Sequence, residues 1–302
     1  MIYLHLLRSR QVLPFVEIKH KFSRFARNML RIKEIEMGKL MVVLAFFASA
    51  VSVAPAMAQG LPTRPGLELG IEGFKYGYEE TSLDVELAGN KVGLTAAYTF
   101  TANQWFAKAD ISYAYGKLRY SSPDGVSTGV PDTSTEGRVI GGRDFFPGTN
   151  LAVSPYIGIG YRQLFNDSRG ETTNGAVGYR RYSNYLYVPI GATARVRAYN
   201  GWMIALNGEY DYFIRGKQVS KLTDTGFPGI PDIRNSQGEG YGIRGSLMFE
   251  KGKWSFGPWI HGWMIEKSDV VVIPLGDDFR VGFQEPENKT WEMGVQVTYR
   301  FF

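Results

Sequence analysis

The sequence WEMGVQVTYRF, residues 291–301, alternates apolar and polar side chains throughout. The odd positions carry Trp, Met, Val, Val, Tyr and Phe, and the even positions carry Glu, Gly, Gln, Thr and Arg. A β-strand has a side-chain period of two, so this segment is expected to be a strand with one apolar and one polar face.

This final strand resembles the C-terminal assembly signal of bacterial outer-membrane β-barrel proteins. The residues that carry the resemblance are Gly294, Val297, Tyr299, Phe301 and Phe302. The resemblance implies that the barrel-assembly machinery reads them. It also implies a small outer-membrane barrel for the chain. The final Phe of that family usually shares the face of the upstream apolar residues; here Phe301 does so, and Phe302 is one residue extra.

The N-terminal region predicts export. Residues 37–39 form a short positive start, residues 40–53 are apolar without a charge, and A-M-A at 56–58 is a small-x-small cleavage pattern. This is the layout of a secretory signal peptide, with a membrane anchor as the alternative. The expected organisation is therefore a mis-assigned or disordered extension over 1–36, a signal peptide over 37–58, and one β-barrel domain over 59–302.

Charge and composition narrow the function classes. Residues 1–58 hold nine Lys/Arg and three Asp/Glu, which leaves 25 basic and 26 acidic residues in 59–302. The formal charge of +5 thus belongs to the leader, and nucleic-acid binding is not expected. The chain has no Cys, which excludes disulfides and Cys-ligated metals. Its 36 Gly and 14% aromatic residues suit a curved, closed sheet.

Ten segments of the remaining chain alternate in the manner of strands, and none holds an apolar run of 18 residues. We expect an all-β, closed antiparallel transmembrane barrel of about ten strands, with eight or twelve as alternatives. Short connections at 102–104, 147–150, 198–201 and 251–253 alternate with long ones, which is typical of periplasmic turns and extracellular loops. The segments are 67–80, 91–101, 105–120, 135–146, 151–165, 178–197, 202–218, 237–250, 254–267 and 288–302.

Parity within each segment assigns the two faces of the wall. Residues such as Leu94, Ile157 and Leu206 are expected to face lipid, and Trp105, Trp202, Trp254 and Trp291 to form aromatic girdles at the two membrane interfaces. A soluble barrel would have the opposite arrangement, and the signal peptide and last strand favour the membrane barrel. The opposite face is expected to line the lumen as a structural polar network: Glu68, Glu72, Lys108, Asp110, Arg162, Arg195, Glu209, Asp211, Arg244, His261, Glu292 and Arg300.

This lumen is expected to be structural rather than catalytic. His261 is the only His after the leader, and a His acts as a general base when a nucleophile and an orienting carboxylate lie within reach. Ten strands resemble the omptin proteases, but neither their paired carboxylates with His at the rim nor the Ser–His arrangement of lipid A deacylases is visible in the sequence. We therefore expect no catalytic, cofactor-binding or metal-binding residues, with Asp277 and Asp278 in a solvated loop.

The sequence predicts a non-enzymatic protein of the cell outer membrane of a Gram-negative bacterium. Its surface loops are expected to serve adhesion, ligand contact or envelope structure. A narrow porin-like channel and a membrane-embedded hydrolase of omptin or lipid A deacylase type remain alternatives. The expected partners are outer-membrane lipid, lipopolysaccharide and, during biogenesis, the barrel-assembly machinery; no cofactor and no nucleic acid are expected.

Overall fold

The structure is a computed structural model that describes residues 5–6, 61–274 and 280–302. The predicted extension and signal peptide, apart from His5 and Leu6, lie outside the described residues, as do Asp277 and Asp278. No helix in the described part of the chain is long and apolar enough to cross a membrane.

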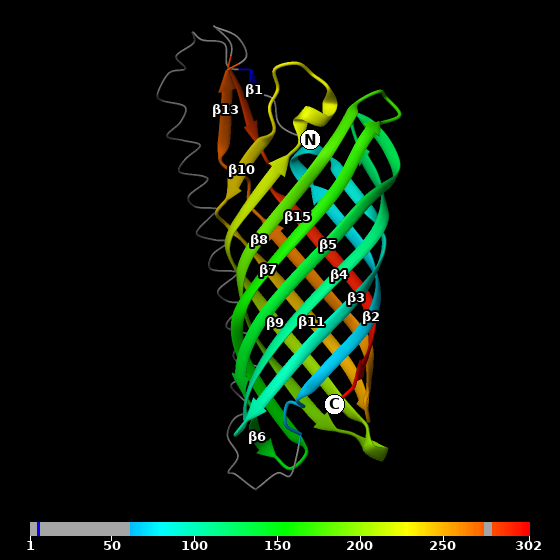
Figure 1. The fold of residues 1–302 in the computed structure, drawn as a ribbon, viewed down its shortest axis with the longest axis vertical. Coiled ribbons are helices and arrows are strands. Elements are labelled where there is room, and N and C mark those ends of the chain that lie inside the picture. The colour runs from blue at the N-terminus through cyan, green and yellow to red at the C-terminus, as the bar shows by residue number, and fades with distance from the viewer. Residues whose placement is uncertain (1–4, 7–60, 275–279) are drawn as a thin grey trace.

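Ten long antiparallel strands close into a barrel in which every strand pairs with the next in sequence, and β15 pairs back onto β2 (Figure 1). The closing register aligns Glu292 with Tyr76 and Arg300 with Glu68. Closure satisfies the backbone donors and acceptors of both edge strands, which a membrane requires. The wall strands are β2 (Gly66–Glu80), β3 (Val85–Ala102), β4 (Trp105–Ser122), β5 (Gly125–Arg143), β7 (Leu151–Glu171), β8 (Val177–Arg197), β9 (Met203–Ser220), β11 (Gly240–Lys251), β12 (Trp254–Ile265) and β15 (Asn288–Arg300).

Short elements complete both ends. The strand β6 (Phe145–Gly148) pairs with β7 and the turn η2 (Tyr199–Gly201) joins β8 to β9, both beside the C-terminus. At the opposite end lie η1 (Thr81–Leu83), η3 (Leu222–Thr225), β10 (Ile233–Gln237), and the hairpin of β13 (Val270–Pro274) and β14 (Arg280–Gln284), which also pairs with β1 (His5–Leu6). Short turns mark the periplasmic end of such barrels, so the end bearing the C-terminus is periplasmic.

The tight turns follow from local sequence. Asn103 and Gln104 join β3 to β4 with φ values of 49° and 70°. Two consecutive residues with positive φ form the turn whose twist matches that of a two-residue hairpin, and Asn tolerates this conformation well.

The outer surface carries the predicted apolar belt. Val92, Leu206 and Val295 are 69%, 54% and 61% exposed, whereas Ala205 and Glu292 point inward and are buried. An apolar band around a closed barrel suits hydrocarbon and would be untenable in water over such an area. The predicted parity is therefore confirmed, and the soluble-barrel alternative is wrong.

Three of the expected long loops are mostly strand. The segments 81–90, 121–134 and 166–177 shrink to short connections because β3, β5 and β7 extend well beyond the apolar belt. Their exposed residues include Glu86 of β3, Thr128 of β5 and Arg169 of β7. Backbone pairing and an inner apolar cluster that includes Val85 and Leu87 stabilise these extensions, whose outer side faces water and needs no apolar residues. The ten strands are confirmed, and so are the long connections after β9 and β12, whereas the predicted lengths of the other three loops were wrong.

Candidate functional site: the polar network of the lumen

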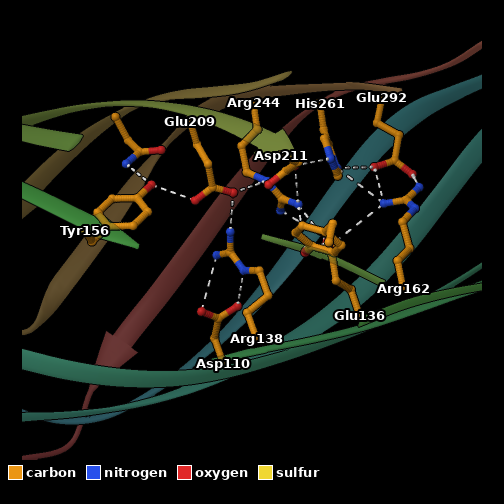
Figure 2. Close-up of polar contacts among 12 residues, drawn as sticks. Asp110, Glu136, Arg138, Tyr156, Arg162, Glu209, Asp211, Arg244, His261 and Glu292 are labelled. Atoms are coloured by element: carbon orange, nitrogen blue, oxygen red, sulfur yellow. Dashed lines mark hydrogen bonds and ion pairs between the residues drawn. The ribbon is translucent and has the colours of Figure 1, made fainter. Parts of the chain in front are cut away.

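Inward side chains from seven wall strands meet in the middle of the barrel (Figure 2). Their positions follow from the strand period, because residues two apart point to the same face. Glu136 and Arg138 lie on β5, Glu209 and Asp211 lie on β9, and five other wall strands each add one residue. Those single residues are Asp110 on β4, Arg162 on β7, Arg244 on β11, His261 on β12 and Glu292 on β15.

Arg162 bridges opposite walls of the barrel. Its Nη2 donates to Glu292 Oε1 at 2.6 Å, and its Nη1 lies 3.5 Å from Glu136 Oε2. The Arg162 side chain is only 2% exposed. Since β7 and β15 are five positions apart around the ring, this ion pair spans the lumen rather than joining neighbours.

His261 lies between two carboxylates. Its Nε2 is 3.3 Å from Asp211 Oδ2, and its Nδ1 is 3.4 Å from Glu292 Oε2. Arg162 Nη1 also lies 3.3 Å from Nδ1. These partners are all charged groups, with no hydroxyl or thiol among them, so the contacts described for His261 supply orienting acids without a nucleophile.

Arg244 and Arg138 extend the network towards the periplasm. Arg244 Nη2 donates to Glu136 Oε1 at 2.7 Å and to Asp211 Oδ2 at 3.2 Å, and its Nε lies 2.8 Å from Glu209 Oε1. Arg138 donates to Asp110 Oδ1 at 2.8 Å and to Glu209 Oε1 at 2.7 Å. Each buried cation thus contacts at least two carboxylates, which offsets the cost of removing these charges from water.

Tyrosines and an amide complete the hydrogen bonding. Tyr156 donates its hydroxyl hydrogen to Glu209 Oε2 at 2.7 Å and accepts from Asn207 Nδ2 at 2.8 Å. Tyr187 donates to Glu136. The two tyrosine hydroxyls thus donate to carboxylate lone pairs that the arginine donors leave free.

An aromatic layer packs inside the barrel above the network, on its extracellular side. Tyr187 packs edge-on against Trp263 at 5.1 Å between ring centroids, and Phe213 and Tyr185 contact the same indole. Further out, Arg181 of β8 crosses the barrel to Glu80 of β2 at 3.0 Å. The fully packed group comprises Leu164, Tyr185, Tyr187, Phe213, Trp263 and Ile265.

The structure divides the predicted lumen residues into three groups. All are inward, and seven come together in the network: Asp110, Arg162, Glu209, Asp211, Arg244, His261 and Glu292. Glu68 and Arg300 form a separate ion pair near the periplasmic mouth. Glu72, Lys108 and Arg195 line the cavity below the network without joining it.

Glu136, Arg138, Tyr156, Asn207 and Tyr187 were missed in the sequence. Alternation would have placed Glu136 and Arg138 on the inner face, since both lie in the predicted segment 135–146 on the parity opposite to Val139. Asp110 and Arg162 pair with them from adjacent strands, but Glu209 and Arg244 lie three or more strands away, and the sequence gives no information on contacts over that distance.

The last strand places the predicted assembly residues on two faces. Val297, Tyr299 and Phe301 point outward, and Tyr299 packs edge-on against Trp254 at 4.9 Å and against Phe301 at 5.0 Å. Gly294 points inward between Phe74 and Trp259, where an added Cβ would lie 2.4 Å from Phe74 Cβ. Gly294 therefore has a packing reason of its own, in addition to its predicted part in recognition.

The closed antiparallel wall and its lipid-facing belt identify the class of protein. This is an outer-membrane β-barrel. No protein-family model matches the chain, and no curated protein matches its sequence.

The similarity to solved structures is one of overall shape at very low identity. The outer membrane protease OmpT from Escherichia coli matches at 10% identity over 80% of this chain and 99% of that chain, with a TM-score of 0.49. The translocator domain of the autotransporter NalP from Neisseria meningitidis matches at 12% identity over 91% and 98%, with a TM-score of 0.37. Neisserial surface protein A matches at 11% identity over 78% and 97%, with a TM-score of 0.34.

Proposed function

We propose that the protein is a non-conducting, non-enzymatic outer-membrane barrel whose extended extracellular end serves contact with ligands or surfaces. The single observation that supports this proposal is the packing of side chains across the lumen. Arg162 and Glu292 join opposite walls at 2.6 Å, and the aromatic layer around Trp263 lies directly above them. Open channels need wider barrels, of about sixteen strands, whereas the interior of a small barrel is filled by side chains.

Electrical recording tests the closure. Purified protein in planar bilayers should give no discrete conductance steps. A variant that shortens the aromatic layer, Tyr187→Ala/Phe213→Ala/Trp263→Ala, should gain steps, which would also demonstrate insertion. The matched control, Tyr212→Ala/Ile243→Ala/Ile260→Ala, removes outward side chains of the same strand region and should stay silent. Steps in the wild type would favour the narrow channel instead.

The contacts of His261 support the proposal that the protein is not an enzyme. Its described polar partners are Arg162, Asp211 and Glu292, and a packed aromatic layer separates it from the extracellular rim. Incubation with fluorogenic peptides, phospholipid and lipid A should give no turnover above that of His261→Gln. If the wild type shows turnover and His261→Gln abolishes it, the protein would be a membrane-embedded hydrolase instead.

The extracellular end supports the contact role. The walls rise above the apolar belt, and apolar side chains stand exposed at the rim, including Phe227 at 59% and Val270 at 53%. Apolar groups exposed above the membrane are available for association. Cells displaying the protein should adhere better to cultured animal cells than cells lacking it, and Phe227→Ser/Val270→Ser should reduce adhesion. Equal adhesion with and without the protein would leave envelope structure as the role.

A further inference from the structure

The periplasmic half of the lumen contains a cavity of about 300 Å³. The polar network lies above it, and residues 61–65 cross its mouth below. The Thr63 backbone N–H donates to Asp144 Oδ2 at 2.7 Å, and Arg64 Nη1 donates to the Gly252 carbonyl at 2.7 Å on another part of the rim. Arg64, Glu68 and Arg300 remain partly exposed at this mouth, so the cavity has contact with periplasmic solvent.

Most charges that line the cavity are neutralised by a partner within ion-pair distance. Arg64 pairs with Glu250 at 2.7 Å, Arg300 pairs with Glu68, and the arginines of the network have the carboxylates given above. Among the cavity-lining residues that the structure describes, three charged side chains have no such ion pair: Glu72, Lys108 and Arg195.

No carboxylate forms an ion pair with Lys108 among the described residues. The nearest acid on its own strand, Asp110, already accepts two hydrogen bonds from Arg138, at 2.8 and 3.3 Å. No hydrogen bond or ion pair from Lys108 to any described residue is present, and its side chain is partly buried facing the cavity. A partly buried cation that forms no ion pair of its own favours binding of an anion.

Arg195 adds a second positive charge with free donors. Its Nη1 donates to Thr63 Oγ1 at 3.2 Å and to Ser154 Oγ at 3.3 Å. Asp144 accepts hydrogen bonds from these same two hydroxyls. Among the described residues, Asp144 does not lie within ion-pair distance of Arg195. The remaining guanidinium donors are therefore open to the cavity, and a guanidinium suits the planar or forked geometry of an oxyanion.

The walls around the two cations are mixed: Phe106 and Ile140 form an apolar part of the lining, and hydroxyl and amide side chains form a polar part. Thr99, Thr193 and Asn207 line the cavity beside them, and Gln296 and Thr95, joined by a hydrogen bond of 3.0 Å, line the opposite part. Glu72 stands apart. Lys108 on β4 is paired with Thr99 on β3, and Thr99 is paired with Gly66 on β2. Glu72 lies six residues further along β2 than Gly66, which is a displacement of about 20 Å along the strand.

We propose that Lys108 and Arg195 form an anion-binding site, reached from the periplasm, for a small hydrophilic molecule that carries a phosphate or carboxylate group. The two cations bind the anionic group, and the surrounding hydroxyl and amide side chains bind the rest of the molecule. The cavity lies at the small end of the range for ligand pockets, which limits the ligand to a few polar groups. Such binding is compatible with the closed lumen, because the site lies below the closure.

Isothermal titration of the purified barrel in a neutral detergent tests the site, with inorganic phosphate and acetate as probes. One saturable site for either probe is expected, and the tighter probe identifies the anionic group. Lys108→Gln and Arg195→Gln should each weaken binding by about tenfold or more, as expected for losing a charge-assisted hydrogen bond. Lys117→Gln, on the outer face of the same strand, is the matched control and should bind as the wild type does, as should Glu72→Gln.

Heat-modifiable migration on gels establishes that each variant is folded. A second readout uses the linkage of binding to stability: phosphate or acetate should raise the Tm of the wild type and of Lys117→Gln, but not that of Lys108→Gln. Absence of a saturable site in the wild type overturns the proposal. So does a folded Lys108→Gln variant with unchanged affinity.

Discussion

The outer and inner faces of strand β9 differ in what they demand of a side chain. Leu206 points outward among other apolar groups and is 54% exposed to the lipid region. Its neighbour Asn207 points inward and donates to Tyr156 Oη at 2.8 Å and to Thr193 Oγ1 at 3.0 Å. The outer face requires only that a residue be apolar, whereas the inner face requires a particular partner across the lumen. The effect of a substitution on stability should therefore depend on the polarity of the new side chain at outward positions, and on the loss of a hydrogen-bond or ion-pair partner at inward positions.

Truncation of the last strand should have the largest effect, because both faces depend on closure. Removing Tyr299–Phe302 deletes the outward Tyr299 and Phe301 and the inward Arg300 that pairs with Glu68. It also exposes backbone groups of β2 and β12 that cannot find partners in lipid. The truncated protein should fail to reach the outer membrane and be degraded in the periplasm, as fractionation and blotting would report.

Deletion of Phe302 alone is the matched control. Its side chain is 70% exposed and lies beyond the last paired residue of β15. Outer-membrane levels should stay near those of the wild type. Normal levels of the four-residue truncation would contradict the assignment of the assembly signal.

Loss of one network partner should come next. Arg162→Met leaves Glu292 and Glu136 buried without their shared cation, at a cost of about 3–5 kcal/mol in the free energy of unfolding. Denaturant titration in lipid vesicles measures it. The double variant Arg162→Met/Glu292→Met should be less destabilised than the sum of the two single variants, because it removes both charges. Additive effects would mean that Arg162 and Glu292 do not interact.

The same titration compares the two faces at equal depth. Leu206→Arg places a guanidinium in hydrocarbon and should cost about 2–4 kcal/mol if the site is near the midplane. Asn207→Arg loses the hydrogen bonds to Tyr156 and Thr193 but stays beside Glu209, so it should be the milder change. Should Asn207→Arg prove the more destabilising of the two, partner loss inside outweighs polarity outside.

The wall could be predicted from sequence, but its internal contacts could not. Alternation placed Leu206 outside and Glu209 inside because the period of a strand is fixed by backbone geometry. The contact of Glu209 with Arg138 depends instead on strand tilt and stagger, which set which residues meet across the lumen. Those quantities belong to the closed barrel as a whole, so single segments carry no record of them.

The extracellular extensions of the strands could not be predicted from the sequence for a different reason. Gly125–Pro131 is rich in small and turn-forming residues and has no continuous apolar face, so its sequence predicts a loop. In the barrel it continues β5, with a register shift between Leu118 and Arg119 of the paired strand. A strand that stands in water on its outer side is held by its ladder of backbone hydrogen bonds, and pattern reasoning detects only the side chains.

The smallest expected effect lies at this extracellular end, where an exposed ion pair contrasts with the buried ones. Hydrogen bonds from Arg180 lower the pKa of Asp224 from its ordinary 3.8 to about 2. A carboxylate with a lowered folded-state pKa contributes stability above its unfolded pKa and loses it as the pH falls towards the folded pKa. The contribution should therefore be complete above about pH 5 and be lost as the pH falls through about 2, and it should be small because solvent screens a pair at the surface. An NMR titration of the Asp224 side-chain carboxyl should give a midpoint near 2, and Arg180→Gln should return it towards 3.8 without affecting closure of the barrel. An unchanged midpoint in Arg180→Gln would show that the ion pair does not form in solution.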